Sequence, residues 1–283
     1  MVWTTEIIDF TNKHCISGHF ALSPYLKGNP LHRKLGLEFK MTEGEMLDYF
    51  HCKTNIEHFA DKVLSAPLTA LQSDLLDNSY RMGLHRIERQ SGCLVSYAIL
   101  MLHELLFQYD KCCIYTSRLR HTNVEVVNLV KRYYEKLPFY LKAGIASWND
   151  TSLGFDTGGR LRTYLTSDNG AMGFSPDFMI MDVEGVTDVR MDEFYRGLFP
   201  TLSARRGSRL HLRGEPGSWI DTLLLRCLNE DGTNKFDFTI KNHSDKPILP
   251  KDELLLNDIE KFIRDSGADI EAVIARCEKI KGS

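Results

Sequence analysis

Residues 88–95 have the spacing of a phosphate-binding loop but lack the side chains with which such a loop works. An apolar run typical of a β-strand precedes them, and an apolar stretch typical of a helix follows. In a working loop, a lysine after the glycine charges the phosphate pocket, and the next residue supplies a hydroxyl for Mg²⁺. This chain has Cys93 and Leu94 there, with neither a positive charge nor an oxygen ligand. We therefore predict that the loop has lost phosphoryl transfer.

An acidic pair ends the most continuously apolar strand pattern of the chain. Residues 178–181 are apolar and are followed by Asp182, Val183 and Glu184. Because side chains alternate along a strand, Asp182 and Glu184 are predicted to lie on one face. They are interpreted either as a distorted acidic site or as two solvated acids at the end of a strand.

Cysteines and histidines show no spacing typical of a metal site. The chain has seven cysteines and no CxxC motif, so neither a zinc site nor a disulfide framework is predicted. An odd, irregular set of cysteines is typical of a reducing, intracellular setting. His51, His58, His85 and His103 form no HExxH pattern. The sequence therefore predicts no metal.

Composition places the chain among soluble globular proteins. It has 283 residues, of which 43% are hydrophobic and 26% are charged, which is ordinary for one large domain. The net charge of −3 excludes the strong overall basic field of dedicated nucleic-acid-binding proteins. A local basic cluster remains at Arg205, Arg206 and Arg209, interpreted as a solvated surface or as a set of DNA or partner contacts. No signal pattern or membrane-spanning run is predicted.

The elements that must position these residues alternate between short apolar strands and amphipathic helices. Strands are predicted at 84–87, 112–117, 178–182, 209–212 and 236–241, a hairpin at 151–166, and helices from Thr42 onward and at 69–78, 94–107, 123–137, 192–199, 251–265 and 268–281. This alternation predicts an α/β fold with a mostly parallel sheet covered by helices on both faces. We predict three segments: an N-terminal arm and helical subdomain at 1–79, a P-loop NTPase-like core at 80–245 and a C-terminal helical segment at 246–283.

Several short segments carry a family resemblance through their order and spacing. They are Leu71–Leu76, Arg89–Gly92, Leu137–Ile145, the turn Asp156–Gly158 and Arg206–Arg209. Together they resemble the ATPase domain of the large terminase subunit of tailed bacteriophages, the motor that pumps DNA into preformed heads. The resemblance covers roughly residues 40–245. The residues after Asp245 are too few for the nuclease domain that follows in the family, so we expect the motor domain alone.

The resemblance implies a nucleotide site that this chain matches only in part. The implied positions are Gln72, similar to the element that reads adenine, and Arg89, Gln90, Ser91, Gly92 and Cys93 of the loop. In the family, adjacent Asp and Glu organise Mg²⁺ and the attacking water. Here either Asp182 lies at the metal position and Val183 replaces the glutamate, or Glu184 is in register and the aspartate is lost. Arg89 is interpreted either as a charge sensor or as part of a structural salt bridge.

The element that couples hydrolysis to movement is also altered. The family has threonines before a Pro-x-Gly turn, whereas this chain has Arg213 to Ser218, which keeps the proline turn and loses the hydroxyls. Met172-Gly173 stands where the family often has Arg-Gly. Because several catalytic positions change while the core pattern is intact, the sequence favours a role for the fold or for a binding surface over hydrolysis.

Three functions follow as hypotheses. The first is a catalytically inactive, terminase-like phage protein without cofactor, which acts as a structural or regulatory partner of particle components, the portal or the active terminase. The second is an atypical but active packaging ATPase that uses Mg-ATP, and the third is a DNA-binding accessory factor. A membrane partner is not expected, and a ring or another oligomer is compatible with the family. The expected location is the host cytoplasm during infection or the virion.

Overall fold

The computed structural model describes residues 42–64, 67–77, 79–166, 174–183, 207–221, 224, 239–246 and 248. The part of the predicted N-terminal arm before residue 42, the predicted helix at 192–199 and the two predicted C-terminal helices lie outside these residues. Among the described residues, no helix is both long and apolar enough to cross a membrane.

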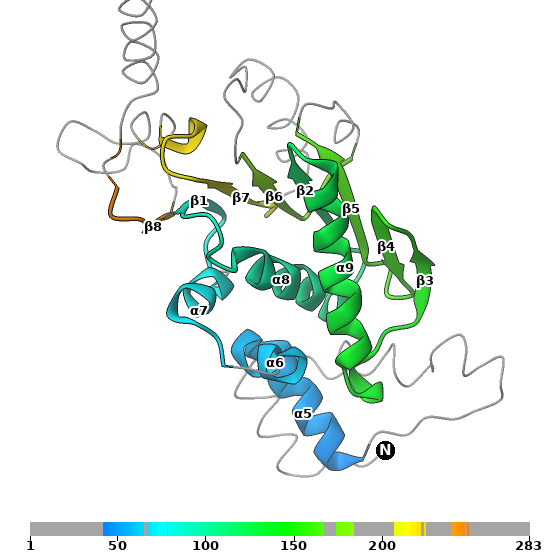
Figure 1. Ribbon diagram of the computed structural model, residues 1–283. Helices are drawn as coiled ribbons and strands as arrows, with labels where there is room; N and C mark the ends of the chain where they lie inside the picture. Colours follow the sequence, from blue (N-terminus) through cyan, green and yellow to red (C-terminus); the bar gives the residue numbers. More distant parts are fainter. Residues whose placement is uncertain are drawn as a thin grey trace, which may run out of the picture.

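One sheet of eight strands organises the described chain (Figure 1). Its order is β3-β4-β5-β2-β6-β7-β1-β8. The strands are β1 Met82–Ile87, β2 Cys112–Ser117, β3 Ile145–Trp148, β4 Ser152–Phe155, β5 Arg160–Leu165, β6 Phe178–Asp182, β7 Arg209–Gly214 and β8 Thr239–His243. Strands β5, β2, β6, β7, β1 and β8 pair in parallel, and only β3–β4 and β4–β5 are antiparallel. The predicted mostly parallel α/β sheet is confirmed.

Helices α8 and α9 pack against the sheet, and the group α5–α7 lies beside α8 (Figure 1). They are α5 Glu43–Thr54, α6 Ile56–Val63, α7 Ala70–Leu76, α8 Cys93–Phe107 and α9 Arg120–Lys136, with a 3₁₀ turn, η1, at Phe139–Leu141. Helix α8 is buried on nearly all sides, as its continuous apolar sequence predicts. It connects the sheet to the helical group α5–α7, because it contacts α7 and α6 as well as α9 and β2.

Alternation along the strands divides the core between the two faces of the sheet. On one face, Phe178 and Ile180 of β6 join the large apolar cluster around α8 and α9. On the other face, Met179 and Met181 join a second cluster with Trp219 and strand residues of β1, β2 and β7. The prediction that both faces are covered is thereby supported by two separate apolar clusters.

Two elements, α6 and β3, were not predicted from the sequence, for physical reasons. Helix α6 follows α5 after Asn55 alone, whose side chain accepts a hydrogen bond from the His58 N–H at 3.0 Å and caps the second helix. No glycine or proline marks this break. Strand β3 is exposed or half-buried throughout, so it lacks the apolar alternation that identifies a strand. The hairpin predicted at 151–166 is therefore part of a three-stranded antiparallel edge.

The turn between β4 and β5 depends on a left-handed glycine. Gly158 has φ +83°, and a Cβ there would clash with the Asp110 carboxylate. We expect Gly158→Ala to lower the free energy of unfolding by about 1–3 kcal/mol, because alanine disfavours this φ and must displace Asp110. Urea denaturation measures the change. Gly44→Ala is the matched control: it lies in α5 with nothing within 4 Å of its Cβ, and alanine should stabilise that helix by about 0.5–1 kcal/mol. Equal midpoints for the two variants would contradict the role of Gly158.

Candidate functional site

The phosphate-loop segment forms a tight turn between β1 and α8, as the sequence predicts. Its backbone twice enters the left-handed region, at Gln90 with φ 59° and at Gly92 with φ 75°. Gly92 is the N-cap of α8, and no side chain caps this helix start. The Ser91 hydroxyl is buried and has no hydrogen-bond partner among the described residues. The segment thus keeps the strand–turn–helix geometry of an anion-binding loop.

Helix α7 places Gln72 against this turn. A Cβ on Gly92 would lie 3.0 Å from Gln72 Nε2, and the Ser96 hydroxyl donates to the Gln72 carbonyl oxygen at 3.1 Å. The Gln72 side-chain oxygen accepts from the Thr69 N–H at 3.0 Å within a capping box. The structure therefore brings together Gln72 and the loop, two parts of the implied site that are distant in sequence.

The residues that replace lysine and serine or threonine are part of the hydrophobic core. Cys93 is 4% exposed and belongs to the large apolar cluster, and Leu94 packs against it. Neither position offers a charge or an oxygen to a phosphate above the loop. The local packing therefore fits the loss of phosphoryl transfer predicted from the sequence.

Asp182 at the end of β6 is held by an arginine. Asp182 is 2% exposed, and both of its carboxylate oxygens lie 3.0 Å from Nη1 of Arg213. Tyr115 donates its hydroxyl to Oδ2 at 3.0 Å; burial raises the pKa of this hydroxyl well above its ordinary value, so it remains a donor. The pairing follows from the sheet, because Asp182 and Arg213 are opposite each other in the β6–β7 register. The carboxylate is thus neutralised by the protein's own guanidinium, and Glu184 lies outside the described residues.

Arg89 and the turn after β7 form a second contact across the site. The Arg89 guanidinium donates to both Glu215 oxygens, at 2.5 and 2.9 Å. The Arg89 side chain is 66% exposed, so this ion pair is a surface contact of modest energy. The structural salt bridge considered for Arg89 in the sequence is therefore present.

A buried ion pair below the loop was not predicted. Arg86 on β1 is fully buried and donates to Asp221 Oδ1 at 2.7 Å and Oδ2 at 3.3 Å. It also donates to the Asn242 side-chain oxygen of β8 at 3.2 Å. An arginine inside an apolar strand pattern is the one signal that the sequence contains. The Arg86 guanidinium thus links β1 to two other elements, the helix that begins at Trp219 and the edge strand β8.

Two buried histidine rings, His85 from β1 and His211 from the neighbouring β7, lie side by side, also without a signal in the sequence. His85 contacts the Tyr97 hydroxyl at 2.9 Å and the Tyr80 hydroxyl at 2.8 Å. The His211 ring stacks on Tyr80 at 4.9 Å, and its nitrogens have no hydrogen-bond partner among the described residues. Burial lowers the pKa of His211 to about 3, so the ring stays neutral at neutral pH. These rings are core residues, because they are enclosed and uncharged.

The basic cluster is only partly described. Arg209 forms an ion pair with Glu104 at 2.7 Å and lies over the Phe178 ring. Its charge is therefore already balanced within the chain. Arg205 and Arg206 lie outside the described residues, so contact of this cluster with DNA or a partner remains a prediction.

Solved structures of phage large terminases share this fold. The large terminase of bacteriophage HK97 is similar with a TM-score of 0.55 at 14% identity, over 72% of this chain and 47% of that protein. Two structures of the large terminase ATPase domain of Thermus phage P74-26 are similar with TM-scores of 0.50 at 17% and 18% identity; each match covers 73% of this chain and 90% or more of the domain. No protein-family model matches the sequence.

These comparisons define the class of the chain by its fold. The core is a mostly parallel α/β sheet of the kind found in large terminase ATPase domains. The chain spans about half the length of the HK97 large terminase. At these identities the likeness establishes the terminase-like fold, which the resemblance in the sequence predicted, and leaves activity to be argued from the site.

Proposed function

We propose that the chain is a catalytically inactive, terminase-like phage protein that acts as a structural or regulatory partner in the phage particle or the DNA-packaging machinery. The observation that carries this proposal is the pairing of Asp182 with Arg213. A magnesium-dependent phosphoryl transfer needs a carboxylate that is available to organise the metal and a cation at the phosphates. Here the carboxylate is already neutralised, and Cys93 stands in the core at the lysine position.

The intact packing of the fold supports a binding role. The eight-stranded sheet, the loop turn and the approach of Gln72 to Gly92 are all present around the altered site. A protein that has the terminase-like fold without ATP hydrolysis presents surfaces that particle components, the portal or an active terminase can recognise. We accordingly propose phage proteins as partners and expect no bound cofactor.

An atypical ATPase is the second candidate, favoured by one observation. Arg89 supplies a positive charge at the mouth of the loop, and its ion pair with Glu215 is exposed enough to rearrange. Under this alternative, Arg89 would take over the charge of the missing lysine and Mg-ATP would bind.

Titration calorimetry with a non-hydrolysable ATP analogue and Mg²⁺ tests the two candidates. We expect no binding by the natural chain and weak binding by the Cys93→Lys, Leu94→Thr variant, because the lysine restores charge while Arg213 still occupies Asp182. The Cys93→Gln, Leu94→Thr variant adds comparable bulk without charge and should not bind. Circular dichroism checks that each variant is folded. Micromolar binding by the natural chain would overturn the inactive assignment, and its loss in Arg89→Gln would favour the atypical ATPase.

A further inference from the structure

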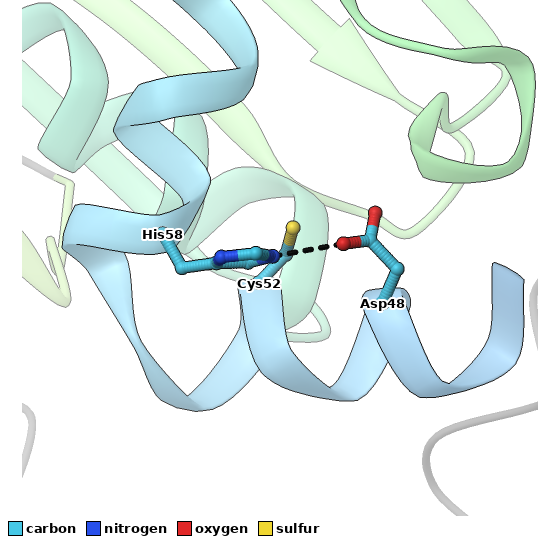
Figure 2. Close-up of side chains that lie close together, drawn as sticks. All are labelled: Asp48, Cys52 and His58. Carbon is cyan, nitrogen blue, oxygen red and sulfur yellow. Dashed lines mark hydrogen bonds and ion pairs between the residues drawn. The ribbon is translucent and has the colours of Figure 1, made fainter. Parts of the chain in front are cut away.

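Three unlike metal-binding side chains converge in the helical group, away from the phosphate loop. Asp48 and Cys52 belong to α5 and His58 belongs to α6, and one donor atom from each lies within 4.8 Å of the others. The Asp48 Oδ1 and His58 Nε2 atoms are 2.8 Å apart. Figure 2 shows the carboxylate, the thiol and the imidazole directed at one another from the two helices.

The helix geometry explains this convergence. Asp48 and Cys52 are separated by four residues, so they lie on one face of α5, one turn apart. Asn55 then ends α5 and caps α6, and this abrupt turn returns His58 to the same face. A one-residue connection between the two helices thus brings the three donors together, although their spacing in the sequence matches no linear zinc motif.

A second layer of contacts orients the donors. The Tyr140 hydroxyl, from η1, donates to Asp48 Oδ2, which leaves Oδ1 directed at His58. His103 of α8 donates a ring N–H to the Cys52 carbonyl oxygen at 2.9 Å, and this bond fixes α5 at the thiol. Partners of this kind hold metal ligands in orientation and raise affinity.

Positive charge already collects at the oxygen that a cation would take. The Lys62 ammonium lies 2.9 Å from Asp48 Oδ1, and its side chain is 30% exposed. The Lys62 side chain can therefore rotate into solvent when a metal cation takes the place of its ammonium at Asp48. Burial raises the pKa of the Cys52 thiol to about 12, so a cation must displace the thiol proton, as happens whenever cysteine becomes a ligand.

We propose that Asp48, Cys52 and His58 bind one zinc-class divalent cation, which joins α5 to α6. Sulfur, imidazole nitrogen and carboxylate oxygen are together the donor set of Zn²⁺, and they disfavour Mg²⁺ and Ca²⁺, which prefer oxygen. Three protein ligands leave one tetrahedral position to water. His58 is 37% exposed and Asp48 19% exposed at the side chain, so the ion has a path from solvent. This proposal is independent of the nucleotide site.

Competition between the purified, metal-free chain and a chromophoric chelator measures the affinity for Zn²⁺. We expect one equivalent to bind and the affinity to fall at least about tenfold in His58→Gln and in Cys52→Ser, because each removes a ligand. Cys112→Ser is the matched control, a cysteine on β2 outside the cluster, and should bind as the natural chain does. With Co²⁺, the natural chain and Cys112→Ser should show a thiolate-to-metal charge-transfer band that Cys52→Ser lacks.

Lys62→Met separates a metal site from a mere ion-pair network. If lysine competes with the cation for Asp48, its removal should tighten zinc binding by about two- to fivefold, the equivalent of an exposed ion pair. Tyr140→Phe should weaken binding by about tenfold while all three ligands remain. The His58 side chain is half-buried, so the His58→Gln variant should stay folded even if the Cys52→Ser variant does not. Undiminished zinc affinity in folded His58→Gln, or a cobalt spectrum without a thiolate band in the natural chain, would overturn the proposal.

Discussion

Replacement of Arg213 by methionine is expected to lower the free energy of unfolding by about 3–5 kcal/mol. The guanidinium of Arg213 is the charge that compensates Asp182, and the two side chains are 4% and 2% exposed. Without it, Asp182 keeps the Tyr115 hydroxyl as a donor but remains a buried charge without a counter-charge. Such a loss exceeds the usual effect of a point substitution. Chemical denaturation followed by circular dichroism measures it.

A double-mutant cycle tests the cause of that loss. Asp182→Leu alone should also destabilise the fold, because it leaves Arg213 buried and uncompensated, whereas Arg213→Met combined with Asp182→Leu should recover most of the loss. Arg132→Met is the control, because its ion pair with Glu125 has side chains 59% and 50% exposed and should contribute at most about 1 kcal/mol. Additive losses in the double variant would show that the two charges do not act as a pair.

The same pair connects stability with the proposed function. Arg213 on β7 is the counter-charge of Asp182 and contributes to the stability of the sheet. A metal that binds Asp182 must displace Arg213 from the carboxylate, which carries a large energetic cost. The functional consequence is that a lysine at position 93 alone should not restore hydrolysis. Under the proposed inactive role, the packing between β6 and β7 opposes metal binding at Asp182, in addition to the substitutions in the loop.

Local patterns were sufficient to predict much of the fold. The bounds of β2 and β6 agree with the predicted strands, because charged or polar residues flank each apolar run. Helix α9 begins at Arg120, three residues before the predicted start at Asn123, since its first turn is polar and carries no apolar periodicity. The loop between β1 and α8 was predicted correctly from Gly92 and the apolar stretch after it.

Contacts between distant segments were beyond such patterns. Arg213 lies opposite Asp182 only because β7 is inserted between β6 and β1 in the sheet, an order that no single strand pattern specifies. The donor cluster around Cys52 was missed for a similar reason: the turn at Asn55 is invisible in the sequence, and the spacing from Cys52 to His58 matches no linear motif. In both cases, strand order or a helix connection decides which side chains meet, and a local sequence pattern does not contain this information.

Arg86→Met is expected to cost about 3–5 kcal/mol of unfolding free energy as well, for a related reason. Arg86 is fully buried, and its partner Asp221 is 1% exposed. Methionine fills much of the same volume, so the loss reports the uncompensated Asp221 charge more than a cavity. The Gly217 N–H still donates to Asp221 at 3.0 Å, but a single amide cannot replace a guanidinium. Urea denaturation gives the value.

The Arg86 prediction also has a structural consequence that separates it from the Arg213 prediction. Arg86 additionally donates to Asn242 of β8 and to the Ser244 carbonyl oxygen, so its removal should loosen the edge strand before the rest of the sheet. Hydrogen exchange should therefore quicken at Ile240–Asn242 in Arg86→Met under native conditions, and stay slow there in Arg213→Met, where β6 and β7 are affected instead. Asp221→Leu combined with Arg86→Met should recover stability. If β8 remained protected, Arg86 would be only the counter-charge of Asp221, and β8 would be held by its backbone pairing with β1.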